Sequence, residues 1–236
     1  MKKIVFYDHF DVGTKPNQTY WNIDVGGSGF GNNEDQFYTD RLDNIYIEDS
    51  LLHIVARKED FEHRKYTSAK ITTKNKVSIQ YGAIEVRMKL PKGLGTWPAF
   101  WLLGDNIHKV GWPTCGEIDL MEYVGKEPDA LHFSLHSKNF NHTKSNNLHL
   151  KKEIKNLSDD FHVYKLEWSK EGFNYYLDNE LLFKAPKEDK QGLDNWPFDE
   201  PFFMIINLAI GGNWGGKIDD SIFPVEFLID YVKVTS

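Results

Sequence analysis

The sequence is dominated by strand-length stretches in which apolar and polar residues alternate with a period of two. This period places successive side chains on opposite faces of a β-strand, and no stretch of comparable length shows the 3.6-residue period of an amphipathic helix. The stretches cover residues 51–57, 66–73, 82–90, 97–103, 117–124, 131–136, 162–168, 173–177, 202–209 and 227–234. So many short strands predict an all-β fold in which two antiparallel sheets pack face to face.

The length and composition of the chain limit the number of domains and the classes of ligand that are possible. A chain of 236 residues without an internal repeat, linker or low-complexity segment predicts one domain over residues 1–236. The net charge of −7 argues against a nucleic-acid partner, which would require a basic face, and favours a neutral ligand. Because Cys115 is the only cysteine, the chain has no internal disulfide, and we expect this thiol to be a small buried apolar group.

The N-terminal residues do not resemble a targeting segment. Residues 1–8 contain two lysines and only a short apolar run, which is too short for the apolar region of a signal peptide. No other stretch approaches the length that crosses a bilayer, so we expect no membrane partner.

The segment GEIDLMEYVG, residues 116–125, places three carboxylates in an apolar strand. Glu117 and Asp119 share one face of that strand, whereas Glu122 has the opposite parity. A β-bulge around Leu120 and Met121 would return Glu122 to the face of the other two acids. Three neighbouring carboxyl groups cannot all ionise easily, so their pKa values should separate and provide both an anionic nucleophile and a protonated acid.

Two other interpretations of these acids are weaker. A solvated strand face would normally pair its acids with Lys or Arg, but none lies between Glu117 and Tyr123. A calcium or magnesium site would need oxygen ligands that surround the ion, for which a straight strand has poor geometry.

Paired carboxyl groups that flank a glycosidic bond are the usual apparatus of glycoside hydrolysis. Glu117 and Glu122 are the outer pair, and a separation of about 5–5.5 Å between their carboxyl groups would indicate retention of anomeric configuration. A glycan cleft also needs flat aromatic walls. Trp97, Ala99 and Trp101 share one strand face that could supply such a wall, with Phe100 and Leu102 on the core side. Trp112 and Trp196 precede prolines in loops, which are positions suited to ligand contact.

Several further segments occur in an order that is characteristic of one enzyme family. They are GNNEDQFYT (31–39), YTSAKI (66–71), YGAIEVRMKLPKGLGTWPAFWLLG (81–104), GWPTCGEIDLMEYVG (111–125), FHVYKLEWS (161–169), WPFDEPFFMIINLAIGGNWGG (196–216) and IDYVKV (229–234). With these motifs the chain resembles glycoside hydrolase family 16, in particular the laminarinase (endo-β-1,3-glucanase) type.

The resemblance implies a concanavalin-like β-jelly-roll sandwich of two curved antiparallel sheets, with the glycan across the concave face. It implies that Glu117 is the nucleophile and that Glu122 is the acid/base. It also implies that Asp119 forms hydrogen bonds with these neighbours and adjusts their ionisation electrostatically. The residue inserted before Glu122 is typical of laminarinases rather than of dedicated lichenases. The cleft residues that it suggests are Asn33, Glu34, Arg87, Trp97, Trp101, Trp112 and His136; for His136 a purely structural role is equally open.

The expected activity is retaining, endo-acting cleavage of laminarin-like β-1,3-glucan, with mixed-linkage β-1,3/1,4-glucan left open as a second substrate. One alternative is a hydrolase of the same fold that acts on agar, carrageenan or porphyran. Another is a non-catalytic β-glucan-binding module, although a binder has no need for all three carboxylates. Lys70 and Lys233 replace arginines that are frequent in relatives, and residues 138–155, rich in His, Asn and Lys, match no family motif.

The resemblance also bears on metal, assembly and location. It suggests a structural calcium ion held by Asp230, with Asp8 and Ser50 in roughly suitable places, while the alternative is that Asp230 is merely hydrogen-bonded. No cofactor is expected for catalysis, and we expect a monomer whose partner is a β-glucan polysaccharide or oligosaccharide. The family implies a secreted or cell-surface enzyme, whereas the lack of a signal peptide leaves a cytoplasmic location open.

Overall fold

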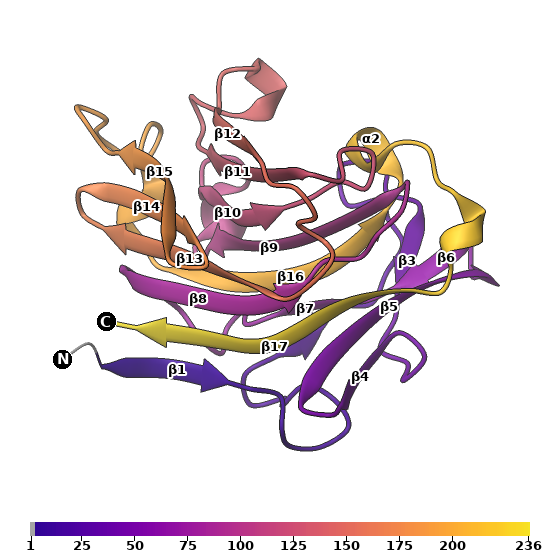
Figure 1. Ribbon diagram of the computed structural model, residues 1–236. Helices are drawn as coiled ribbons and strands as arrows, with labels where there is room; N and C mark the ends of the chain where they lie inside the picture. The colour runs from indigo at the N-terminus through magenta and orange to yellow at the C-terminus, as the bar shows by residue number, and fades with distance from the viewer. Residues whose placement is uncertain (1–2) are drawn as a thin grey trace.

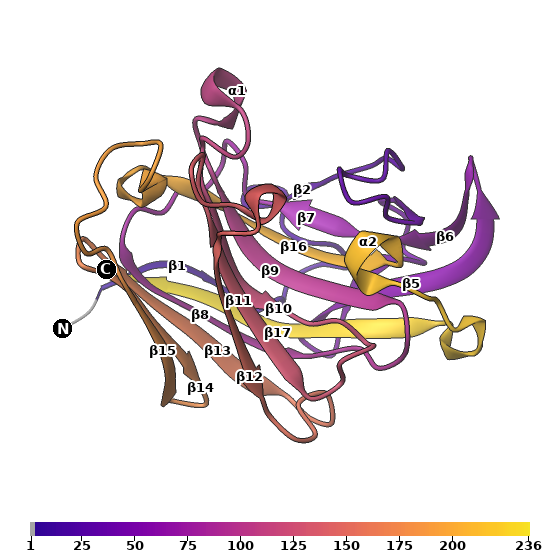
Figure 2. The same cartoon turned by 90° about the horizontal axis from the view of Figure 1, so that it is seen from above.

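The strands of the protein form two curved sheets that lie face to face (Figures 1 and 2). The computed structural model describes residues 3–236. The ten-stranded sheet has the spatial order β15 (Glu180–Pro186), β14 (Gly172–Leu177), β13 (His162–Ser169), β8 (Gly82–Lys89), β17 (Val225–Thr235), β5 (Leu51–Phe61), β6 (Arg64–Ser68) and β3 (Gln36–Tyr38). In addition, β1 (Ile4–Asp8) pairs with β17, and β4 (Ile45–Glu48) pairs with β5.

The seven-stranded sheet contains the strand with the three carboxylates Glu117, Asp119 and Glu122. Its spatial order is β12 (Leu148–Glu153), β11 (Ala130–His136), β10 (Glu117–Glu122), β9 (Thr96–Gly104), β16 (Phe202–Ile210), β7 (Lys70–Thr72) and β2 (Asn22–Ile23). Among the described strands only the pair β3 and β6 is parallel. The predicted all-β sandwich of antiparallel sheets is therefore confirmed.

Helices are short and lie in the connections. They are α1 (Ile107–Val110), α2 (Gly212–Gly215) and the 3₁₀ turns η1 (His142–Lys144), η2 (Pro197–Asp199) and η3 (Asp220–Ile222). Within residues 3–236, no helix has the length and apolar character needed to span a bilayer.

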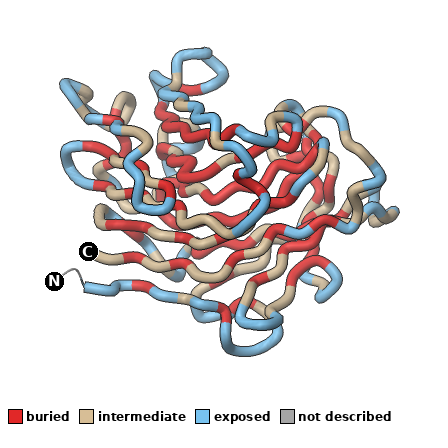
Figure 3. Tube along the Cα trace, viewed as in Figure 1, coloured by how far each residue is buried: buried red, intermediate tan, exposed pale blue. Residues whose placement is uncertain are grey.

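The core lies between the two sheets because each strand turns alternate apolar side chains inward. Ile84 and Val86 of β8 and Phe100, Leu102 and Ile118 of the seven-stranded sheet are all fully buried. Figure 3 shows the same pattern along the trace, with buried residues in the strands and exposed residues in the connecting loops. Each such side chain contributes roughly 1.5–3 kcal/mol of transfer free energy, so the sheets are fixed against each other.

The predicted strands agree with the structure at most positions. The stretch 66–73 is divided at Ala69, where the chain passes from β6 in one sheet to β7 in the other. Asp178 and Asn179 form a two-residue hairpin turn between β14 and β15, with φ values of 49° and 68°. The short strands β1, β2, β3 and β4 and the edge strand β12 were not predicted. β12 has no buried residue, so it lacks the alternation that marks a half-buried strand.

Candidate active site

A β-bulge in β10 brings the three carboxylates to one face of the seven-stranded sheet. On the β9 side, the register skips one residue between Asp119 and Met121, and on the β11 side it shifts between Asp119 and Glu122. Leu120 and Met121 both lie in the core. Glu117, Asp119 and Glu122 consequently line the same cleft, and the predicted bulge is confirmed.

The cleft encloses about 360 Å³ and crosses the strands of the seven-stranded sheet. It extends from η1, beyond β11, across β10, β9 and β16 to β7 and to the loop that precedes β3. The lining residues are Phe30, Gly31, Asn32, Glu34, Tyr38, Lys70, Trp97, Ala99, Trp101, Leu103, Ile107, Trp112, Glu117, Asp119, Glu122, His142, Thr143 and Asn207. A cleft of this size, whose walls combine aromatic side chains with many polar and charged groups, suits a polar small-molecule or oligomeric ligand.

The strand β9 supplies the predicted aromatic wall. Trp97, Ala99 and Trp101 face the cleft, while Phe100 and Leu102 are fully buried in the core. Because the alternation of a strand fixes both sets at once, the core packing of β9 also orients the tryptophans that line the cleft.

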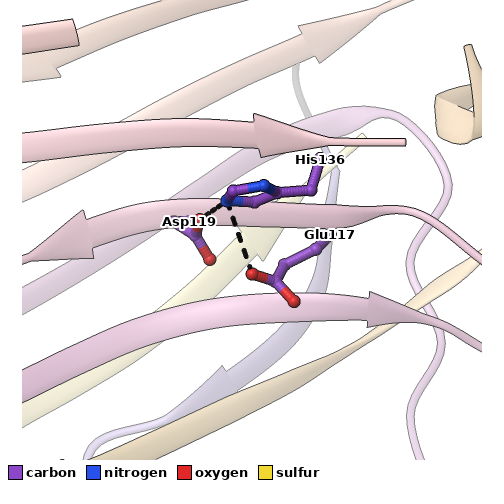
Figure 4. A group of neighbouring side chains, drawn as sticks. All are labelled: Glu117, Asp119 and His136. Carbon is purple, nitrogen blue, oxygen red and sulfur yellow. Dashed lines mark ion pairs between the residues drawn. The ribbon is translucent and has the colours of Figure 1, made fainter. Parts of the chain in front are cut away.

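Donors from neighbouring side chains reach each carboxyl group. Trp112 donates its indole N–H to Glu117 Oε2 at 2.8 Å, and Trp97 donates its indole N–H to Glu122 Oε1 at 3.2 Å. His136 Nε2 lies 3.2 Å from Asp119 Oδ2 and 3.6 Å from Glu117 Oε1. Dashed lines in Figure 4 mark these two contacts. The side chain of His136 is nearly buried, so this sequence-predicted residue lies beside two of the three acids.

Burial and mutual repulsion alter the acidity of the cluster. Burial raises the pKa of Glu117 to about 8, with a further contribution from the Asp119 charge, whereas His136 and the Trp112 N–H act in the opposite direction. Burial also raises the pKa of Asp119. The pKa of Glu122 lies well above its ordinary value because of burial and because of the charges of Asp119 and Glu117. The cluster therefore retains protons at pH values where isolated carboxyl groups are fully ionised.

We expect Asp119→Asn to stabilise the fold at pH 8 and to have little effect at pH 4. A carboxyl group whose pKa is raised by folding binds more protons in the folded state, so its contribution becomes destabilising as pH rises from about 4 toward the raised value. Each pKa unit of this rise is worth about 1.4 kcal/mol, and each kcal/mol changes Tm by roughly 2–4 °C, so removing the carboxyl group should raise Tm at pH 8 by several degrees or more. Thermal melts at both pH values measure this difference.

The exposed Asp60 offers a matched control, since Asp60→Asn removes the same charge without removing a buried group. An equal gain in Tm at pH 4 and pH 8 for Asp119→Asn would contradict the electrostatic explanation.

Of the two residues predicted from the loop before β3, Glu34 lines the cleft and Asn33 does not. Glu34 lines the cleft, is buried, and accepts hydrogen bonds from Gln36 Nε2 at 2.6 Å and Tyr38 Oη at 3.2 Å. Asn33 does not line the cleft: its side chain is exposed and donates to Asn213 Oδ1 at 3.0 Å. Its neighbour Asn32 occupies the cleft position instead.

The prediction that Arg87 lies in the cleft is wrong. Arg87 belongs to β8 of the ten-stranded sheet, and its guanidinium pairs with Asp230 and lies 4.5 Å from the ring centroid of Phe161. Val86 and Met88 on either side of it face the core, so alternation turns Arg87 to the outer face of the sandwich, away from the cleft.

Trp196, which was predicted to contact the ligand, does not line the cleft that contains the three carboxylates. This side chain is only 4% exposed and packs against Phe173 and Phe198, with ring centroids 5.7 and 4.9 Å away. It immediately precedes η2 and closes one end of the apolar core.

The residues suggested for calcium do not form a site that fits the ion. Asp8 accepts hydrogen bonds from the Phe10 backbone N–H and from Trp21 Nε1, and Asp230 is paired with the cationic Arg87. Ser50 lies in the turn between β4 and β5. The guanidinium of Arg87 already neutralises the Asp230 carboxylate, which disfavours a second cation there, so these residues do not fit a calcium ion.

Some residues that line the cleft were not predicted from the sequence. Asn207 is the only polar residue in β16; it accepts the indole N–H of Trp101 at 2.7 Å and donates to Tyr38 Oη at 3.0 Å. An isolated Asn in a buried apolar strand is a signal that could have identified it. His142 and Thr143 come from the segment that matched no motif, and nothing in their spacing pointed to the cleft.

A curved β-sandwich that presents paired carboxyl groups in an aromatic cleft defines a class of carbohydrate-cleaving proteins. The family model for Glycosyl hydrolases family 16 matches residues 32–233, and the chain belongs to this family.

Among curated proteins, the chain is 41% identical over 241 residues to a beta-glucanase from Rhodothermus marinus, covering 98% of this chain and 84% of that protein. Two other curated relatives are longer, and the chain spans 37% and 34% of their lengths.

Among solved structures, it is 44% identical to the laminarinase from Flavobacterium sp. UMI-01, with a TM-score of 0.92 and coverage of 99% of this chain and 100% of that one. The laminarinase from Rhodothermus marinus is 40% identical, with a TM-score of 0.96 and coverage of 100% and 97%. The predicted family and its laminarinase type are thus confirmed.

Proposed function

We propose that the protein is a retaining endo-β-1,3-glucanase that cleaves laminarin-like glucans. The observation that carries the proposal is the bulged strand β10, which presents Glu117, Asp119 and Glu122 together in an aromatic-walled cleft. The similarity to laminarinases and to a beta-glucanase over almost the whole chain supports the choice of substrate.

The carboxyl groups perform a double displacement. Glu117 attacks the anomeric carbon while Glu122 gives its proton to the glycosidic oxygen, so the bond to the leaving sugar breaks and a glycosyl ester forms on Glu117. Glu122, now a carboxylate, takes a proton from water, whose oxygen attacks the same carbon and releases Glu117. Two displacements at one carbon retain its configuration.

The surroundings of the two glutamates favour this division of roles. Glu117 receives the short hydrogen bond from Trp112 and lies near His136, and both contacts stabilise its anionic form. Glu122 has one longer hydrogen bond from Trp97 and two acidic neighbours, which favours its protonated form. Asp119 lies within hydrogen-bonding reach of Glu117 and beside His136, and we infer that it adjusts the ionisation of the two glutamates.

Incubation with laminarin, lichenan, agarose, carrageenan and porphyran, followed by sizing of the products, tests the substrate. We expect short oligosaccharides from laminarin, and cleavage of lichenan would extend the activity to mixed-linkage glucan. Products from a galactan alone would replace the proposal with a galactanase. Retention of laminarin without any products would indicate a binding module.

The stereochemical outcome is a separate prediction. We expect NMR spectra of the first products from laminarin to show the β-anomer, which mutarotation then converts slowly into the mixture. An initial α-anomer would contradict the double displacement, even if laminarin is the substrate.

The proposal extends to the organisation of the protein. We propose that residues 1–236 form a single catalytic domain that acts as a monomer, without a cofactor, on glucan outside the cell or at its surface. Size-exclusion chromatography with light scattering, and assay after exhaustive chelation, test the first two points.

A further inference from the structure

The connection between β11 and β12 forms one end wall of the cleft. Its 3₁₀ turn η1 places His142 and Thr143 among the lining residues, although the segment that contains them matches no family motif. The two strands that it joins lie at the opposite end of the seven-stranded sheet from β7 and β2.

The His142 ring packs on the two residues that contact Glu117. Its centroid lies 5.1 Å from that of Trp112 at an interplanar angle of 33°, and 5.2 Å from that of His136 at 82°. Trp112 and His136 are themselves 6.3 Å apart. The three rings therefore form a cluster in which His142 is the closer ring neighbour of Trp112.

The loop that carries His142 is fixed by its own hydrogen bonds. Asn141 is buried and donates its amide to the backbone oxygens of Ser137 and Lys138 at 3.0 and 3.2 Å. The neighbouring Asn139 donates its side-chain amide to Asn195 Oδ1 at 2.7 Å, which ties the loop to a distant segment. A buried, satisfied amide at the base of the loop gives His142 a defined position.

Trp112 needs such support because it lies in an exposed turn. Its side chain is 36% exposed, and its indole N–H makes the hydrogen bond to Glu117 Oε2. A half-exposed indole without a neighbour on its face would sample other rotamers, and each departure would remove a donor from the carboxylate.

We propose that His142 is a positioning residue, which packs on Trp112 and thereby holds the indole N–H on the Glu117 carboxylate. This inference rests on the proposed role of Glu117 as nucleophile. His142 acts through Trp112, so the ring of His142 matters rather than its nitrogen atoms.

A double-variant cycle tests the coupling on laminarin. We expect His142→Ala and Trp112→Phe each to lower kcat/KM about tenfold, the effect of losing one hydrogen bond to a charged group, mainly through kcat. The double variant should be no worse than Trp112→Phe, because the bond that His142 supports is already absent. His142→Phe keeps an aromatic ring and should restore most of the activity.

The pH dependence of kcat/KM on its acid side separates the proposed role from a general loosening of the packing, which would not shift it. Trp112 lowers the pKa of Glu117, so His142→Ala should shift the acid limb of kcat/KM to higher pH, whereas His142→Phe should not. His108 on α1 is exposed, and His108→Ala serves as the matched control.

An NMR measurement keeps the inference testable without any activity. The indole N–H resonance of Trp112, assigned by its absence in Trp112→Phe, should move on His142→Ala toward the position of a solvent-exposed indole. An unmoved resonance, an additive loss in the double variant, or an unchanged His142→Ala enzyme would each overturn the inference. If wild type cleaves no glucan but the resonance moves as expected, the proposed function fails while the packing role stands.

Discussion

Glu117→Gln should abolish the release of reducing ends from laminarin while leaving the fold intact. The amide has the shape of the carboxylate and can still contact Trp112, but it cannot form the glycosyl ester. Loss of a covalent nucleophile lowers kcat by on the order of 10⁴-fold or more. Reducing-end assays over long incubations measure the loss, and thermal melts establish that the variant is folded.

Two controls make this result specific. Glu153 is exposed on the edge strand β12, so Glu153→Gln removes a similar charge without touching the cleft. In Glu117→Gly, added azide should act in place of the missing carboxylate and yield a glycosyl azide of inverted configuration from an activated substrate. Appreciable laminarin hydrolysis by folded Glu117→Gln would assign the nucleophile to another residue.

Strand periodicity was sufficient to predict the centre of the site. Parity alone indicates that Glu122 cannot share a face with Glu117 unless a residue is inserted, and the structure places that bulge at Leu120. The same alternation of faces correctly predicted that Trp97 and Trp101 face the cleft rather than the core side of β9. These predictions succeeded because they depend only on neighbours within one strand.

Predictions that depended on relations between strands were less reliable. Arg87 is on a strand as expected, but only the sheet order shows that β8 belongs to the ten-stranded sheet and that Arg87 meets Asp230. Trp196 precedes a proline in a connection, yet it packs against Phe173 of β14, which is remote in sequence. Tertiary packing, which local pattern does not encode, decides whether a loop aromatic meets ligand or core.

The end wall of the cleft was the least predictable part. Residues 138–155 have no strong alternation. Their positions depend on hydrogen bonds of asparagine side chains, from Asn139 to the side chain of the distant Asn195 and from Asn141 to the nearby backbone oxygen of Ser137. The cluster of three carboxylates therefore follows from a strand motif, whereas the shape of the cleft around it depends on loops such as the one that contains η1.

The second large effect is expected for Glu122→Ala, and it should depend on the leaving group. Natural glucan requires protonation of the departing oxygen, so kcat/KM on laminarin should fall about 10²–10⁴-fold, the usual contribution of a general acid. A dinitrophenyl glycoside leaves without a proton, so its kcat/KM should stay close to the wild-type value. Parallel assays on both substrates give the comparison.

The second step of the reaction, hydrolysis of the glycosyl ester, gives an independent test of the role assigned to Glu122. Without a base to activate water, the glycosyl ester on Glu117 should accumulate during turnover of the dinitrophenyl substrate, and intact-protein mass spectrometry would detect it. Azide, which needs no base, should release the ester as a glycosyl azide of retained configuration. If activity falls equally on laminarin and on the activated substrate, Glu122 does not act as the acid, and the raised pKa of its carboxyl group reflects only its burial beside Asp119 and Glu117.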